Sequence, residues 1–258
     1  AAVTTPMVIC ASRPARGMTL IELLIALALA AFLVLGLVQI AAAASAAGRL
    51  QLNQAQVLDR ARFAMGILGR AVRQAGYRPE PWNSAYADGA LGVATLDGAT
   101  AAGDRLELQA WSDRNCFDNR NPDRDADGRP RFYLRESTFD LTADGSLALT
   151  CRYGPAPDSL TTQIPRQGVL PGVEAFQVLY GEDADGDGNV DGWLRAGQWA
   201  DARNVLGVRI GLLLASDDAV AEPLNASFEV LGTAVQAPAD GKLRRLFDFA
   251  AAFRGRTG

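Results

Sequence analysis

The sequence contains no histidine and only one lysine among its 258 residues. Without histidine the chain cannot form a Ser-His-Asp triad, a Cys-His pair or a zinc site of the HExxH type. It also lacks the G-x-S-x-G and S-x-x-K motifs and a glycine-rich phosphate loop followed by lysine. These absences disfavour an enzyme, so we expect a non-catalytic protein.

Basic residues are also fewer than acidic residues. The chain has 25 basic and 29 acidic residues and a net charge of −4. Residues 1–17 carry two arginines and no acidic residue, so their removal would leave 23 basic residues against 29 acidic ones. A nucleic-acid ligand requires a basic face that neutralises phosphates. We therefore expect no nucleic-acid partner.

Cysteine is rare, with residues at Cys10, Cys116 and Cys151. If an N-terminal segment were removed, the last two would remain as a pair, which would form a disulfide in an oxidising compartment. Two buried free thiols are the alternative.

One long hydrophobic run lies near the N-terminus. No polar residue occurs between Leu23 and Val38, and only two interrupt the run before Gly48. Such a run of about 25 residues can cross a bilayer as a helix. A cleaved signal peptide would use the small residues near Ala46, whereas an uncleaved anchor explains the length and the preceding arginines. Neither explains Glu22, because a carboxylate in hydrocarbon costs roughly 3 kcal/mol on insertion scales.

A third interpretation accounts for this glutamate. The stretch Gly17-Met18-Thr19-Leu20-Ile21-Glu22 resembles the prepilin processing site of type IV pilins and type II secretion pseudopilins. The resemblance implies that a prepilin peptidase cuts after Gly17, that the new N-terminal Met18 is methylated, and that Glu22 becomes the fifth mature residue. Met18 stands where the family usually has phenylalanine. Glu22 would then neutralise the terminal ammonium of a neighbouring subunit, since an unpaired buried charge is costly.

Two further blocks narrow this resemblance to the PilW-type minor pilins. The block "RFAMGILGRAVRQAGYR" is similar to an L-x-x-x-I-R-x-A-G-Y/F stretch of that family, with Val72 in place of isoleucine. The ending "LRRLFDFAAAFRGRTG" is similar to the family's R-x-F-x-x-x-x-x-L-R-N-R tail, with Arg254-Gly255-Arg256 in place of Arg-Asn-Arg.

The resemblance implies a non-catalytic subunit of a tip complex. With other minor pilins it would prime assembly of the major pilin, present a large tip adhesin, and support twitching motility and adhesion. We expect a single-pass protein of the bacterial inner membrane with a periplasmic head, which then moves to the pilus and cell surface. Two alternatives remain open: a J-type minor pseudopilin of a type II secretion system, and a membrane-anchored extracellular binding domain.

For the whole chain we expect an α+β, pilin-like fold, with a long N-terminal helix as a spine packed on an antiparallel β-sheet head. Apolar residues continue at helical spacing from Leu50 to Ala75, before Gly76 and Pro79. Downstream, alternating residues and Asp-Gly pairs predict strands and turns. The candidate strands are 106–110, 131–136, 146–153, 173–180, 205–214 and 227–231. The expected segments are a leader (1–17), a transmembrane or filament-core helix (18–47), an amphipathic helix (48–76) and a β-rich head (77–258).

An aspartate-rich loop near residue 183 is a candidate calcium site. Its potential oxygen ligands follow the spacing of an EF-hand loop, in which a glycine allows the sharp turn after the third ligand. These residues are Asp183, Asp185, Asp187, Asn189 and Asp191, with Gly188 as the glycine. Because Leu194 replaces the bidentate glutamate of a complete EF-hand, we predict a truncated calcium loop, with a solvated turn as the alternative.

A second loop repeats the first part of this pattern. Asp123, Asp125 and Asp127 have the same spacing. Arg129 and Arg131 follow them, and positive charge beside the loop makes it the weaker calcium candidate. We expect no other cofactor.

Overall fold

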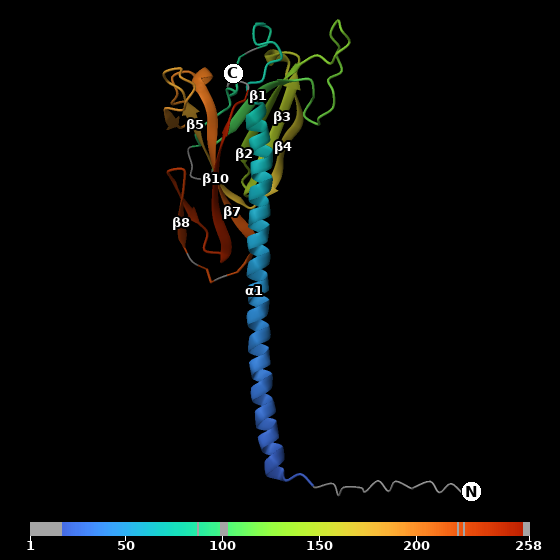
Figure 1. Cartoon of the computed structure of the whole chain (residues 1–258), viewed down its shortest axis with the longest axis vertical. Coiled ribbons are helices and arrows are strands. Elements are labelled where there is room, and N and C mark those ends of the chain that lie inside the picture. The colour runs from blue at the N-terminus through green and yellow to red at the C-terminus, as the bar shows by residue number, and fades with distance from the viewer. Residues whose placement is uncertain (1–16, 87, 99–102, 221, 224, 255–258) are drawn as a thin grey trace, which may run out of the picture. The chain divides into compact units, whose positions relative to one another are not determined.

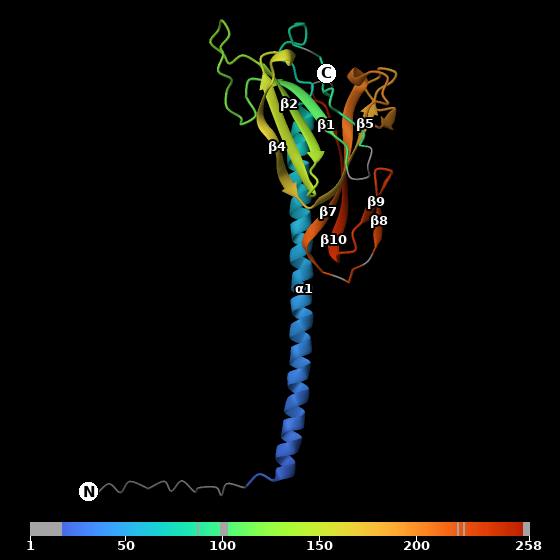
Figure 2. The same cartoon turned by 180° about the vertical axis from the view of Figure 1, so that it is seen from behind.

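The computed structural model describes residues 17–86, 88–98, 103–220, 222–223 and 225–254, and Figures 1 and 2 show it from opposite sides. The chain divides after Gly48 into two compact units, and each is described by itself. Apart from Gly17, the predicted leader lies outside the described residues.

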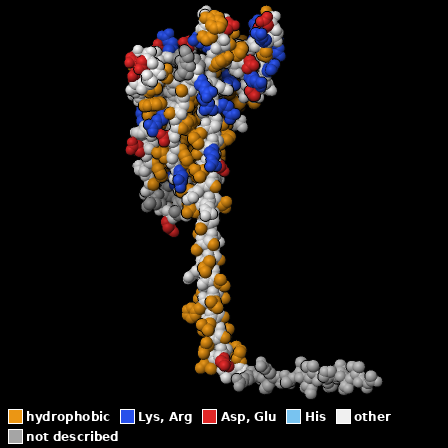
Figure 3. Space-filling model, in the orientation of Figure 1, with side chains coloured by type: hydrophobic (Ala, Val, Ile, Leu, Met, Phe, Trp, Pro, Cys, Tyr) orange, Lys and Arg blue, Asp and Glu red, His pale blue; other side chains and the backbone are white. Residues whose placement is uncertain are grey.

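A single helix, α1 (Leu20–Gln74), provides the described part of the first unit and continues into the second. Between Leu20 and Gly48 its side chains are mostly apolar and almost all exposed (Figure 3). Among the described residues, α1 is the one helix long and apolar enough to cross a membrane, judged by length and composition. A helix that is apolar on all sides is typical of a segment surrounded by lipid or by other subunits.

In the second unit α1 is amphipathic. Its fully buried apolar residues recur every three or four positions and are Val57, Ala61, Ala64, Leu68 and Val72. This spacing places them on one face of the helix. Leu50, the first residue of the predicted stripe, is 39% exposed, so burial of the apolar stripe starts later than the sequence suggests.

The helix ends where the sequence predicts a stop. Gly76 adopts a φ of 76°, a left-handed conformation that favours glycine just beyond a helix. Its N–H donates a hydrogen bond to the Gln109 carbonyl at 2.8 Å, and the Trp111 N–H donates to the Tyr77 carbonyl at 2.9 Å. These bonds fix the end of the helix against the first strand.

The described strands form three antiparallel sheets. The first has the order β1-β2-β3-β4, the second the order β10-β7-β5-β6, and the third is the hairpin β8-β9 (Figures 1 and 2). Their bounds are β1 (Leu106–Ser112), β2 (Tyr133–Leu141), β3 (Ser146–Gly154), β4 (Thr161–Pro171), β5 (Val173–Glu182), β6 (Gly192–Leu194), β7 (Val205–Ala219), β8 (Ala226–Val230), β9 (Thr233–Ala237) and β10 (Lys242–Ala252). Two short 3-10 helices, Pro157–Ser159 and Ala202–Asn204, lie in loops.

One core joins the apolar stripe of α1 to both large sheets. It includes Leu106 of β1, Phe139 of β2 and Phe176 of β5, all at most 2% exposed. On the other face of the second sheet, Ala175 and Leu213 pack against Val230 and Val235 of the β8-β9 hairpin. Since both faces of β5 and β7 are covered, these strands are buried along most of their length.

The predicted α+β class and long helix are confirmed. All six predicted strands are present, although the one expected at 131–136 starts at Tyr133 and continues to Leu141. Four further strands were not predicted from the sequence: β4, β6, β9 and β10. All four are edge strands with one neighbour each among the described strands. An edge strand tolerates proline and irregular polarity, so the alternation that identifies central strands is weak there.

Candidate functional site

The predicted processing and docking residues lie at the start of α1. Thr19 precedes the helix, and its carbonyl accepts the first intrahelical bond, from the Leu23 N–H at 3.2 Å. The Thr19 N–H and hydroxyl each donate to Glu22 Oε2 at 2.9 Å, and the Glu22 N–H donates to Thr19 Oγ1 at 3.3 Å. This reciprocal arrangement is a capping box, which stabilises a helix N-terminus.

The capping box leaves part of Glu22 open. All hydrogen bonds that Glu22 accepts from the described residues end on Oε2, so Oε1 is available to a further donor. Gly17 and Met18 are exposed, with Met18 at 69%. The peptide bond between them is therefore accessible, while Arg13 and Arg16 of the leader lie outside the described residues.

The two downstream cysteines form the predicted disulfide. Cys116 lies in the loop after β1, Cys151 lies in β3, and their Cα atoms are 6.0 Å apart. The Cys116 N–H also donates to Gln163 Oε1 of β4 at 3.0 Å. The bridge spans 35 positions, which corresponds to about 4 kcal/mol of stabilisation in the chain-entropy model. It ties the loop that carries the second aspartate cluster to the first sheet.

The first aspartate loop brings three carboxylates together. One oxygen each of Asp183, Asp185 and Asp187 lies within 4.8 Å of the others. Two oxygens that share a calcium ion at 2.3–2.6 Å are at most about 5 Å apart, so this spacing fits a shared ion. Asn189 and Asp191 complete the predicted set, and the Asp191 carboxylate accepts from the Ala184 N–H at 2.7 Å.

The same loop is organised around Asp183, which is only 7% exposed. Its carboxylate accepts the backbone N–H groups of Gly186, Asp187 and Gly188 at 2.7, 3.2 and 2.9 Å. Asp183, the first candidate ligand, therefore stabilises the conformation of the loop. Calcium binding stays a prediction.

The second aspartate loop uses its carboxylates differently. Asp123 accepts a hydrogen bond from the Tyr133 hydroxyl at 2.6 Å, which raises the pKa of Tyr133 to about 12. Asp125 accepts the N–H groups of Asp127 and Arg129. Among the described residues only the first loop brings three acidic groups close enough to share an ion.

A pocket of about 490 Å³ in the second unit was not predicted from the sequence. It is lined by the last turn of α1, by β1 and the start of β2, and by Arg254. Arg73 and Tyr77 belong to the first block quoted for the family resemblance, and Arg254 belongs to the second. Both blocks are rich in arginine, which is the feature of the sequence that could have pointed to this pocket. The sequence does not show that the two blocks lie side by side in the fold.

Comparisons with known proteins agree with the N-terminal signal. Residues 12–38 match the model described as "Prokaryotic N-terminal methylation motif", and residues 131–254 match "Type IV Pilus-assembly protein W". A sequence search of curated proteins found no match. The chain is similar to the solved structure of the type IV-like pilin TTHA1219 from Thermus thermophilus, with 18% identity, a TM-score of 0.48, and coverage of 78% of this chain and 97% of that one.

Proposed function

We propose that this chain, a member of the PilW family of type IV pilus-assembly proteins, is a minor pilin that helps to prime pilus assembly at the tip and supports twitching motility and adhesion. The family is structural and not enzymatic. Its prepilin motif implies processing by prepilin peptidase. The other proposed partners are further minor pilins, the major pilin and a tip adhesin. The proposed location is the inner membrane, with the head in the periplasm, and then the pilus.

The observation that carries the proposal is the placement of Glu22. It lies five residues beyond Gly17, counting Met18 as the first, at the start of an apolar helix whose side chains are exposed between Leu20 and Gly48. A helix of this kind can lie in lipid before assembly and in a filament core after it. In the filament core, Glu22 Oε1 would accept a hydrogen bond from the methylated N-terminal ammonium of a neighbouring Met18. This pairing is needed because an unpaired charge in a low-dielectric core is costly.

N-terminal processing provides the first test. Mass spectrometry of the protein recovered from its own cell envelope should give a peptide that begins at N-methyl-Met18. A strain without prepilin peptidase should give the unprocessed chain. A terminus near Ala46, or an uncleaved chain in the wild type, would contradict the proposal and favour a membrane-anchored binding domain.

Glu22 provides the second test. The Glu22→Ala variant should be processed normally but should reduce pilus number and twitching motility, because it removes the charge that docks a neighbouring subunit. Thr19→Ala is the matched control, since it breaks the capping box but keeps the carboxylate. A deletion strain distinguishes a minor pilin from the remaining alternative, a minor pseudopilin of a type II secretion system. Loss of type II secretion with normal twitching would identify a pseudopilin of the secretion system.

A further inference from the structure

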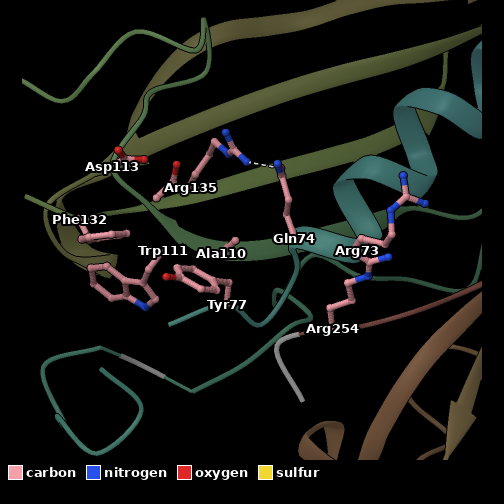
Figure 4. A pocket seen from close by; sticks show the side chains of 10 residues that line it. Arg73, Gln74, Tyr77, Ala110, Trp111, Asp113, Phe132, Arg135 and Arg254 are labelled. Atoms are coloured by element: carbon pink, nitrogen blue, oxygen red, sulfur yellow. Dashed lines mark hydrogen bonds between the residues drawn. The ribbon is translucent and has the colours of Figure 1, made fainter. Parts of the chain in front are cut away.

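The pocket at the end of α1 combines arginine and aromatic side chains. Figure 4 shows Phe132, Trp111 and Tyr77 on one side and Arg73 and Arg254 on the other, and Arg135 reaches toward Gln74. The remaining lining residues are Gln74, Ala110, Ser112 and Asp113. Its volume of about 490 Å³ falls within the range of ligand-binding pockets.

Arg135 is the unusual member of this set. It is half-buried, and its Nη2 donates to Gln74 Oε1 at 2.6 Å, but no described carboxylate lies within ion-pair distance of it. The most buried arginines are paired: Arg60 contacts Asp217, and Arg244 contacts Glu174 and Asp240. The other half-buried arginines also have ion pairs; they are Arg78, Arg114, Arg152 and Arg195. A half-buried guanidinium that contacts only a neutral amide has unused capacity for an anion.

The surrounding charges favour an anion. Arg73 and Arg254 add two exposed guanidinium groups, and neither has an ion pair among the described residues. Asp113 supplies the one carboxylate in the lining, and the C-terminal end of α1 adds about half a negative charge. The three guanidinium charges exceed both. Burial lowers the pKa of Arg135, and a bound anion would offset the cost of keeping this group charged.

The aromatic side supplies apolar surface beside the charge. Tyr77 is 47% exposed, and its ring lies 6.3 Å from that of Phe132, centroid to centroid. Trp111 is almost fully buried and packs edge-on against Tyr86, with ring centroids 4.8 Å apart. Tyrosine, tryptophan and arginine are the residues that dominate binding energy in protein interfaces. This composition fits a peptide segment better than a simple inorganic anion.

We propose that this pocket binds an acidic segment of a partner protein, with a carboxylate held by Arg135, Arg73 and Arg254 and an apolar side chain against Tyr77 and Phe132. That the partner is another filament subunit rests on the function proposed above. Binding of an acidic peptide does not depend on that function. The chain itself has a net charge of −4, so the pocket is a local reversal of its overall charge.

Binding of a defined peptide to the full chain in detergent tests the pocket. The probe is a fluorescein-labelled peptide of alternating glutamate and phenylalanine, and the matched peptide carries glutamine in place of glutamate. The glutamate peptide should bind at least about tenfold more tightly, and binding should weaken between low salt and 0.5 M salt, because exposed charges are screened. Arg135→Gln should weaken it at least about tenfold.

Two variants keep this test decisive. Arg245→Gln changes an exposed arginine of β10 outside the pocket lining and should leave binding unchanged. Arg254→Gln alters an exposed pocket residue and should also weaken binding, so it replaces Arg135→Gln if that variant fails to fold. Equal binding of both peptides, or equal loss in Arg245→Gln and Arg135→Gln, would overturn the proposal. Succinate that competes at the peptide's own affinity would also overturn it in favour of a small-acid site.

A crosslinking experiment in cells tests the subunit assignment. A benzophenone amino acid in place of Phe132 should crosslink to an acidic segment of another pilin-type subunit, and crosslinks confined to the chain itself would contradict this. The two proposals fail separately. A deletion strain with normal pili would overturn the proposed function and leave peptide binding intact, whereas unchanged peptide binding by Arg135→Gln would overturn only the pocket assignment.

Discussion

Arg60 is the residue that ties α1 most directly to the second sheet. Its side chain is 9% exposed; Nη1 donates to the Ala215 carbonyl and Nη2 to Asp217 Oδ1, both at 2.6 Å. Gly172 makes room for it: with a φ of 74°, a Cβ there would lie 2.6 Å from Nη1. A glycine turn and a buried arginine therefore depend on each other.

Loss of this side chain should destabilise the second unit. Arg60→Met removes the hydrogen bond to Ala215 and leaves that carbonyl without its partner, so we expect the free energy of unfolding to fall by about 1–3 kcal/mol. Arg62→Met is the control, because Arg62 pairs with Asp59 at the exposed surface and should change stability by less than about 0.5 kcal/mol. Urea titration of both variants measures the difference, and equal losses would contradict the role of Arg60.

Glu136 predicts a specific dependence on pH. Burial, and then the neighbouring Glu107, raise the pKa of Glu136 above its ordinary value of 4.5, although Arg152 acts in the opposite direction. A carboxyl group whose pKa is raised by folding contributes its full stability below the unfolded pKa and loses it as pH rises through the folded pKa. The unfolding free energy of the wild type relative to Glu136→Gln should therefore increase as pH falls from 7 toward 4.5. A pH-independent difference would contradict the raised pKa.

At the scale of elements, whether a helix or strand can be predicted from the sequence depends on its pattern of apolar residues. The helix α1 follows from a continuous apolar run and an amphipathic stripe, and the central strands follow from alternation or from apolar runs. The strand β4 contains two prolines and polar residues on both faces, so its residues carry no strand pattern. The pocket could not be predicted because its residues come from the end of α1, from β1 and β2, and from the segment after β10. Only tertiary pairing brings them together.

The first aspartate loop is the element for which we expect calcium to matter. Millimolar calcium should raise the midpoint of thermal unfolding in the wild type, because an ion bound only to the folded state stabilises it. Asp185→Asn removes one charge but can still accept the Asp187 N–H bond, and it should abolish most of the shift. Asp125→Asn is the matched control in the second loop and should leave the shift unchanged. If calcium leaves the unfolding midpoint of the wild type unchanged, the loop is a solvated turn and not a calcium site.

At the scale of the whole molecule, the two units differ in what stabilises them. The described core residues all lie between Val57 and Phe253, so the second unit has its own hydrophobic core. The described part of the first unit is a helix whose apolar surface is exposed and which has no core of its own. An exposed apolar helix of this kind is typical of a segment surrounded by lipid or by other subunits, whereas the second unit has the core of a folded domain.

A fragment of residues 49–258 should accordingly be soluble and should unfold cooperatively, as circular dichroism can measure. A fragment of residues 75–258 is the control. It lacks the buried stripe of α1, so it exposes the core faces of both large sheets and should aggregate or lose cooperativity. Aggregation of the longer fragment would contradict the division after Gly48.

The position of Arg254 has a consequence for the life of the protein in the cell. This residue follows β10, an edge strand whose one neighbour in its sheet is β7. A chain that is truncated before β10, or whose last strand has not yet docked, therefore lacks a complete arginine pocket. If the pocket binds a partner, this binding also selects for complete folding. Copies whose last strand is missing or undocked would not bind the partner and would not enter the assembly.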